Sequence, residues 1–151
     1  MAKIFDVADF FIQKSHSIDM PITHLKLQKL CYYAQAWSLV LNNNKRLFNG
    51  EFQAWVHGPV NPELFRKYKD YGWDPIDCTY NEPALDKSEK RIMTEVWGVY
   101  GSYDAKFLEA LTHNEEPWKE ARKGLPDDAY SKQTINEDTM RRYYSDLLKQ
   151  S

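Results

Sequence analysis

The stretch PITHLKLQKLCYYAQAWSLVL, residues 21–41, is expected to form the helix around which the rest of the chain packs. Apolar residues recur in it at spacings of three, four and seven, the periodicity of one helical face. Further apolar residues fill the other side, a pattern typical of a helix buried on several faces. Thr23 is predicted to cap the first turn, and the asparagines at 42–44 to end the helix, since Asn tolerates a left-handed backbone. The sequence therefore predicts a buried central helix.

The composition is that of an ordinary globular protein. The chain has 151 residues, 42% apolar and 28% charged, which suits a single domain spanning 1–151. A net charge of −2 disfavours nucleic-acid binding, which requires a basic face. The N-terminus lacks the pattern of a signal peptide, and the apolar runs are too short to span a membrane. We therefore expect a cytoplasmic protein.

The remaining sequence predicts several shorter helices. They are expected over about 4–16, 62–71, 87–100, 104–112, 117–122 and 137–149. Asp6 is predicted to cap the first of them, and Asp86 with Glu89 to form a capping box. Phe107, Leu108 and Leu111 are predicted to face inward, as are Met140, Tyr143, Tyr144, Leu147 and Leu148 in the last helix.

Little of the chain is expected to be extended. Residues 52–56 alternate between apolar and polar like a short strand, after a turn signal at Asn49-Gly50. Residues 57–62 are predicted to continue neither a strand nor a helix, because Pro59 and Pro62 lack backbone donors. Asn61 is predicted to cap the helix after it. The fold class is therefore mainly α, with orthogonally packed helices around the buried central helix and at most a small β-hairpin.

A catalytic interpretation depends on three side chains. His57, His113 and Glu115 could supply an acid/base pair for a small hydrolase-like enzyme. The structural alternative is that His113 and Glu115 hydrogen-bond loop amides and fix the turn before Pro117. No nucleophile, oxyanion loop or phosphate-binding glycine motif accompanies them, so the structural interpretation is favoured.

The cysteines and histidines do not form a recognisable metal or nucleophile site. Cys31 is expected to be buried, and Cys78 lies in a loop segment without a neighbouring base. No pair of histidines has the spacing of metal ligands on a helix. We predict no metal, no cofactor and no catalytic residue.

Aromatic residues are abundant, at 15% of the chain. Trp97 and Trp118 are expected to be internal. Trp73 opens the irregular segment 73–83 and is the best candidate for an exposed tryptophan, the residue type that most often anchors a protein interface.

Three motifs in register resemble one known family. ITHLKLQKLCYYAQAW (22–37), AWVHGPVNP (54–62) with YKDYG (68–72), and LTHNEEPWKEAR (111–122) are similar to the Panacea domain, also called SocA-like or GepA-like and phage-associated. The third stretch matches a TH-x-E-x-PW pattern, and the resemblance covers nearly the whole chain. Cys31 stands where the family often has an aliphatic residue, and Val56-His57 where an aromatic residue before Gly58 is common.

The resemblance implies a non-enzymatic role. Domains of this family act as antitoxins in two-gene toxin–antitoxin systems of bacteria and phages, and some members are adaptors that deliver the toxin to a protease. The expected partner is therefore a cognate toxin, with a protease added in the adaptor alternative. The family motifs map onto residues that we expect to be structural: His57, Gly58, Pro59, Thr112, His113, Glu115, Pro117 and Trp118.

The toxin-binding surface is a separate prediction. Loops can vary without disturbing a core, so they are a natural source of partner choice. We expect segment 73–83 and the C-terminal helix to contribute, through Trp73, Tyr80 and Tyr143.

Overall fold

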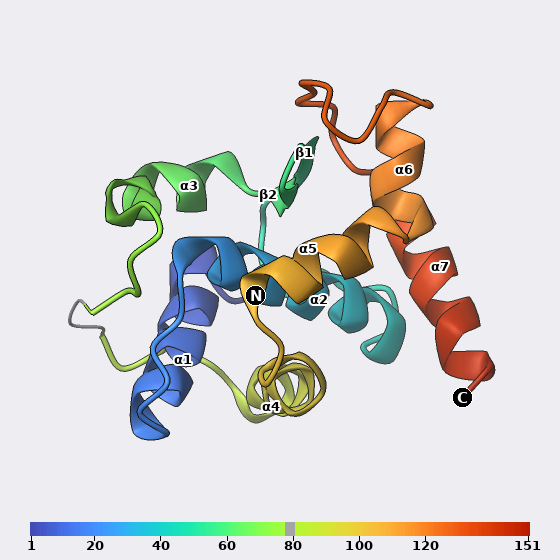
Figure 1. Cartoon of the computed structure of the whole chain (residues 1–151). Helices are drawn as coiled ribbons and strands as arrows, with labels where there is room; N and C mark the ends of the chain where they lie inside the picture. The colour runs from blue at the N-terminus through green and yellow to red at the C-terminus, as the bar shows by residue number, and fades with distance from the viewer. Residues whose placement is uncertain (78–80) are drawn as a thin grey trace.

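Helix α2 (His24–Leu41) forms the centre of the computed structural model, which describes residues 1–77 and 81–151 (Figure 1). Thr23 caps it, because the hydroxyl oxygen accepts a hydrogen bond from the Lys26 amide at 3.2 Å. The helix ends as predicted, with Asn43 and Asn44 at φ of 52° and 65°. Most of its residues are buried. The predicted central helix is confirmed.

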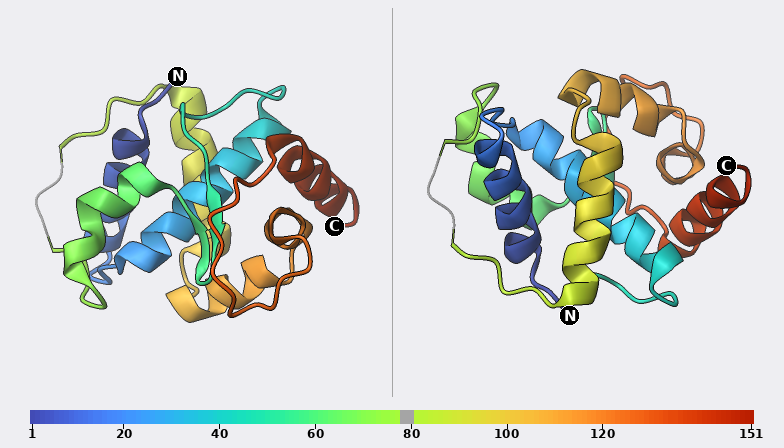
Figure 2. Two further views of the ribbon diagram at one scale, coloured as in Figure 1. Left: turned by 90° about the horizontal axis from the view of Figure 1, so that it is seen from above. Right: turned by 90° about the horizontal axis from the view of Figure 1, so that it is seen from below.

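The other elements surround α2 and make the fold mainly α, as predicted. They are α1 (Ile4–Ser17), β1 (Gln53–Trp55), β2 (Gly58–Val60), α3 (Pro62–Tyr68), the 3₁₀ turn η1 (Lys69–Tyr71), α4 (Lys87–Tyr100), α5 (Ala105–His113), α6 (Glu116–Arg122) and α7 (Glu137–Lys149). Helices α1 and α3 pack on α2 toward its start, and α7 packs on it toward its end (Figures 1 and 2). Helices α4 and α5 contact α2 between these two ends.

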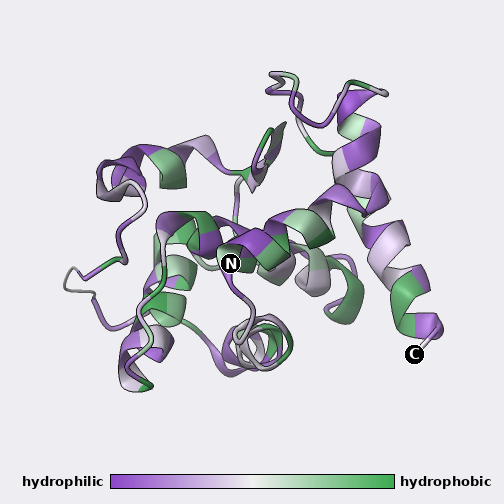
Figure 3. Cartoon of the chain, in the orientation of Figure 1, coloured by the Kyte–Doolittle hydropathy of each residue, from purple (hydrophilic) through white to green (hydrophobic). Residues whose placement is uncertain are grey.

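The polar residues of α2 are buried along with its apolar ones. Polar and apolar residues alternate along the first turns of the helix (Figure 3). Gln28 exchanges two hydrogen bonds with the backbone of Asn61, at 2.9 and 3.1 Å. Gln35 accepts from the Leu47 amide and donates to the Phe48 carbonyl, both at 2.8 Å. These amides tie the segments after α2 to the central helix, satisfying backbone groups that burial would otherwise leave unpaired.

The β-hairpin corrects one prediction. Residues 58–60 form strand β2, which pairs antiparallel with β1 so that Pro59 lies opposite Ala54. The hairpin turn lies at 56–57 and not at the predicted turn signal. The other edge of β1 is occupied, since the Ala54 amide donates to the Gln133 carbonyl at 2.8 Å. β2 is therefore an edge strand, the position in a sheet that tolerates proline.

Most helix starts follow the predicted caps. Asn61 accepts from the Leu64 amide at 2.9 Å, and Asp86 and Glu89 form the capping box. The prediction for Asp6 is wrong, because α1 begins one turn earlier with Lys3 at the cap position and no capping side chain. Asp6 lies in the first turn, where a carboxylate also stabilises a helix.

Two predictions of inward-facing residues are wrong. Phe107 is 49% exposed and stacks on Tyr103, with ring centroids 4.3 Å apart. Leu147 and Leu148, near the end of α7, are also exposed. In both helices, the apolar residues at helical spacing form a stripe that is wider than the face covered by neighbouring elements. Leu108 in α5 and Met140 and Tyr144 in α7 form the buried part.

Three further findings concern possible sites. No helix within the described ranges 1–77 and 81–151 combines the length and apolar character needed to cross a membrane. In the same ranges, no three His, Cys, Asp or Glu side chains are arranged to hold a metal ion. Cys31 is fully buried, and burial raises the pKa of its thiol. Cys78 lies outside the described residues.

Candidate functional site

The glycine of the second motif has a backbone that only glycine adopts easily. Gly58 has φ of +106°, and a Cβ built on it would lie 2.9 Å from Lys29 Cε and 3.1 Å from Thr112 Oγ1. A side chain at this position would therefore strain the backbone and clash with both neighbours. Gly58 and Thr112, from two of the motifs, thus meet at the point where β2 packs on α2 and α5.

The residues of the third motif hold the hairpin from the other side. Trp118 is buried and donates from Nε1 to the Trp55 carbonyl at 2.9 Å. The His113 ring stacks on the Trp118 ring with centroids 3.9 Å apart, and burial lowers the pKa of His113. Pro117 lies in the first turn of α6, where a missing amide hydrogen costs nothing. These contacts fix the hairpin against α6.

Glu115 is the buried acid of this motif. Its Oε1 accepts hydrogen bonds from the Tyr33 and Tyr144 hydroxyls, both at 2.8 Å, and Tyr144 also contacts the Tyr32 hydroxyl at 3.1 Å. Burial raises the pKa of Glu115 to about 7, although both tyrosine hydrogen bonds act to lower it. The expectation that Glu115 bonds loop amides is wrong. Its carboxylate instead joins α2 and α7 at the start of α6.

The three side chains of the catalytic interpretation each have different partners. His57 Nδ1 lies 2.9 Å from Glu109 Oε1. His113 stacks on Trp118, and Glu115 is held by tyrosine hydroxyls. No contact joins these three groups to one another within the described residues, so the geometry gives the acid/base hypothesis no support.

A fully buried lysine lies beneath the hairpin, and the sequence did not single it out. Lys29 is 0% exposed, and its Nζ has no hydrogen-bond partner in the part of the chain that the structure describes. Burial lowers the pKa of Lys29 to about 8, while the nearby charge of Glu109 acts to raise it. The central helix therefore carries an ammonium group that costs stability where it lies. The available signal was a lysine in a helix whose apolar residues lie on nearly all sides.

Replacing this lysine is expected to stabilise the protein. Lys29→Met should raise the free energy of unfolding at pH 7 by about 1–3 kcal/mol, because it removes a buried charge and keeps a similar volume. Relative to Lys29→Met, which lacks this titrating group, the wild type should gain stability as the pH rises from about 8 to 10.5, where the unfolded lysine binds a proton that the folded one has lost. Urea unfolding measures both effects. Lys90→Met, at an exposed position of α4, is the matched control and should change stability by less than ~0.5 kcal/mol.

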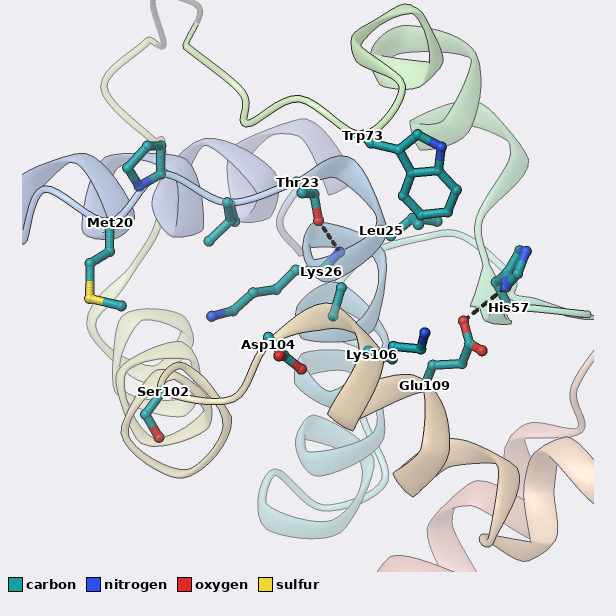
Figure 4. A pocket seen from close by; sticks show the side chains of 13 residues that line it. Met20, Thr23, Leu25, Lys26, His57, Trp73, Ser102, Asp104, Lys106 and Glu109 are labelled. Atoms are coloured by element: carbon teal, nitrogen blue, oxygen red, sulfur yellow. Dashed lines mark hydrogen bonds and ion pairs between the residues drawn. The ribbon is translucent and has the colours of Figure 1, made fainter.

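A groove of about 640 Å³ lies between the start of α2, the hairpin tip and α5 (Figure 4). It brings together two residues that the sequence singled out separately, His57 and Trp73. Their rings meet edge to face with centroids 6.4 Å apart. Trp73 is 76% exposed, so the prediction of an exposed tryptophan is confirmed. The rest of the wall comes from segments within 20–26 and 102–109.

Of the three residues predicted to bind the partner, Trp73 and Tyr143 lie on different parts of the molecule. Trp73 follows η1 on the side of the molecule that holds α3, whereas Tyr143 belongs to α7 at the other end of α2 (Figures 1 and 2). Tyr143 is half-buried and packs on Tyr144. Tyr80 lies outside the described residues. Of the two described residues, Trp73 lines the groove and Tyr143 does not.

Lys26 and Lys106 are groove residues that the sequence analysis did not identify. Both lie in the first turn of a helix, a position that usually favours acidic residues. Neither first turn contains an acid. A lysine in the first turn of each of these helices was the signal that the sequence offered.

Comparison with known proteins gives a family and one curated relative. The family described as "Antitoxin SocA-like, Panacea domain" matches residues 27–119. Antitoxin SocA of Caulobacter vibrioides (strain NA1000 / CB15N) is 41% identical over 66 residues, which are 44% of this chain and 35% of the relative. The chain thus matches about a third of that relative's length. No solved structure matches the chain. The family match spans more than half of the sequence, from α2 to the first residues of α6, and the chain therefore belongs to the SocA-like Panacea antitoxin-domain family.

Proposed function

We propose that this protein neutralises a cognate toxin by direct contact, through the surface around Trp73, in the cytoplasm of a bacterium. Membership of an antitoxin family supports a toxin partner. The observation that carries the proposed surface is the exposed indole of Trp73 at the rim of a large groove. Large exposed apolar side chains at a concave surface are typical of interfaces.

A few anchor residues are expected to supply most of the binding free energy of such a contact. A stable interface buries about 1,200–2,000 Å² in total, and a few residues supply most of its energy. Trp73 is suited to this role because its ring is uncovered in the free protein, with His57 beside it. Burial of the ring by a partner would remove a large apolar area from water.

Trp73→Ala is expected to weaken toxin binding by about 30-fold, which corresponds to about 2 kcal/mol for an anchor residue. The melting temperature should stay unchanged, because the side chain is mostly exposed. Titration calorimetry with the purified protein of the adjacent reading frame, with thermal unfolding alongside, measures both quantities. Tyr130→Ala is the matched control, since Tyr130 is 75% exposed but does not line the groove. Equal affinity for wild type and Trp73→Ala would refute the assignment of this surface.

The proteolytic adaptor alternative makes a different prediction about the toxin itself. A direct blocker leaves the amount of toxin unchanged, whereas an adaptor lowers it. Co-expression of the two proteins, followed by measurement of toxin abundance after synthesis is stopped, separates the two mechanisms. We expect the toxin to persist in a stable complex. Its loss in the presence of the antitoxin would favour the adaptor.

A further inference from the structure

The indole of Trp73 is exposed, but its backbone is held in a tight turn. The Gly72 amide donates to the Lys69 carbonyl at 3.0 Å. The Asp74 amide donates to the Tyr71 carbonyl, also at 3.0 Å. These two bonds fix the point from which the Trp73 side chain projects. They leave its side-chain torsions free, so the orientation of the ring depends on what the ring touches.

The Trp73 ring touches the imidazole of His57. Their ring planes lie at 81° to one another, with the centroids 6.4 Å apart. Aromatic rings prefer this arrangement, in which the edge of one ring meets the face of the other. His57 is therefore placed to hold the indole in one orientation. It can do so only if its own ring is fixed, because the His57 side chain is itself 55% exposed.

Glu109 fixes the His57 ring from α5. His57 Nδ1 donates a hydrogen bond to Glu109 Oε1 over 2.9 Å (Figure 4). The Glu109 side chain is 27% exposed, so water screens this bond less than it screens a fully exposed surface pair. Thr112, three residues later on the same face of α5, lies against Gly58. One face of α5 thus holds both the backbone of the hairpin tip and the imidazole that projects from it.

We propose that Glu109 positions the His57 imidazole, and that His57 in turn holds the Trp73 indole in one orientation at the groove rim before a partner binds. Glu109 and His57 are positioning residues, and Trp73 is the residue that touches the partner. The inference rests on the proposed function for that last contact. An anchor that is ordered in advance loses less side-chain entropy on binding, so the complex is tighter. Glu109 also acts on Lys29 through its charge, an effect that does not depend on the hydrogen bond to His57.

Nitrogen-15 relaxation of the indole N–H groups tests the positioning without any partner. The chain has five tryptophans, and the indole signal missing from Trp73→Phe is that of Trp73, while the others report whether each variant is folded. The Trp73 order parameter should be about 0.8 in the wild type, close to a rigid group, and below about 0.6 in Glu109→Ala and in His57→Ala. Adding Glu109→Ala to His57→Ala should lower it no further. A flexible Trp73 in the wild type, or an unchanged order parameter in Glu109→Ala, would overturn the proposal.

Glu109→Gln separates the hydrogen bond from the charge. The glutamine oxygen can still accept from His57 Nδ1, but the variant no longer carries the charge that acts on Lys29. The Trp73 order parameter should stay within about 0.1 of the wild-type value. A loss as large as that in Glu109→Ala would trace the effect to charge and refute the positioning. Glu95→Ala is the matched control, because it removes a carboxylate of another ion pair, on α4 and outside the groove, and it should leave Trp73 unchanged.

Binding of the adjacent-gene protein separates this inference from the proposed function. Glu109→Ala should weaken binding by about fivefold in the wild-type background and by less than about twofold in the Trp73→Ala background. Equal losses in both backgrounds would mean that Glu109 contacts the partner directly, which refutes the positioning while the antitoxin function stands. If Trp73→Ala binds as tightly as the wild type although Glu109→Ala releases the indole, the positioning stands and the proposed surface is wrong.

Discussion

Glu115→Ala is expected to lower the free energy of unfolding by about 3 kcal/mol at pH 6. The substitution removes the acceptor of the Tyr33 and Tyr144 hydroxyls, both of which are buried, and an unpaired buried hydroxyl costs about 1–3 kcal/mol. Urea unfolding measures the change. Glu116→Ala is the matched control, because the neighbouring Glu116 is partly exposed and pairs with Arg142 at the surface. Its loss should stay below ~1 kcal/mol. Equal losses for the two variants would show that Glu115 is not a structural link.

The same residue gives the protein a pH-dependent stability. Burial raises the pKa of Glu115 from 4.5 to about 7, so the folded chain binds more protons than the unfolded one between these values. Its contribution is fully present below about pH 4.5 and is lost as the pH rises through 7. Relative to Glu115→Gln, which does not titrate, the wild type should lose on the order of 3 kcal/mol over this range. Parallel stability curves for the two proteins would contradict this account.

Arg122→Ala is expected to destabilise the fold by about 3–5 kcal/mol. The Arg122 guanidinium is buried and donates to the carbonyls of Ala54, Pro126 and Ala129, and its Cζ lies over the Trp118 ring, 4.5 Å from the ring centroid. Removal leaves these carbonyls without their donor and releases the segment after α6 from β1.

Two further variants test this role of the guanidinium. Arg122→Lys should recover little, because a single ammonium cannot reach carbonyls in three directions as the planar guanidinium does. Arg91→Ala removes an exposed arginine paired with Glu95 at 3.8 Å, and should change stability by less than ~0.5 kcal/mol. Thermal and urea unfolding of the three variants measure these differences. Full recovery by lysine would mean that charge alone, rather than the fork of donors, holds the segment.

Some features of the candidate site could be predicted from the sequence, and others could not. Trp73 was predicted to be exposed because the segment after Gly72 lacks periodicity, and the structure places it at the groove rim. Its meeting with His57, sixteen residues earlier, was not predictable from either local pattern. The sequence shows Lys29 only as a polar residue within the predicted central helix. Its complete burial follows from β2 and α5, which cover it from segments far along the chain.

The sequence by itself determined the elements whose signals lie within a few residues of one another. A cap such as Thr23 or Asn61 acts on an amide three residues later, and the capping box of Asp86 acts over the same short distance. The tertiary structure alone decided which side of each element is covered. Pro59 is tolerated in a strand because β2 lies at an edge, and Phe107 stays 49% exposed because, among the described residues, Tyr103 covers its ring only in part. Burial depends on contacts between distant segments, and local periodicity does not encode those contacts.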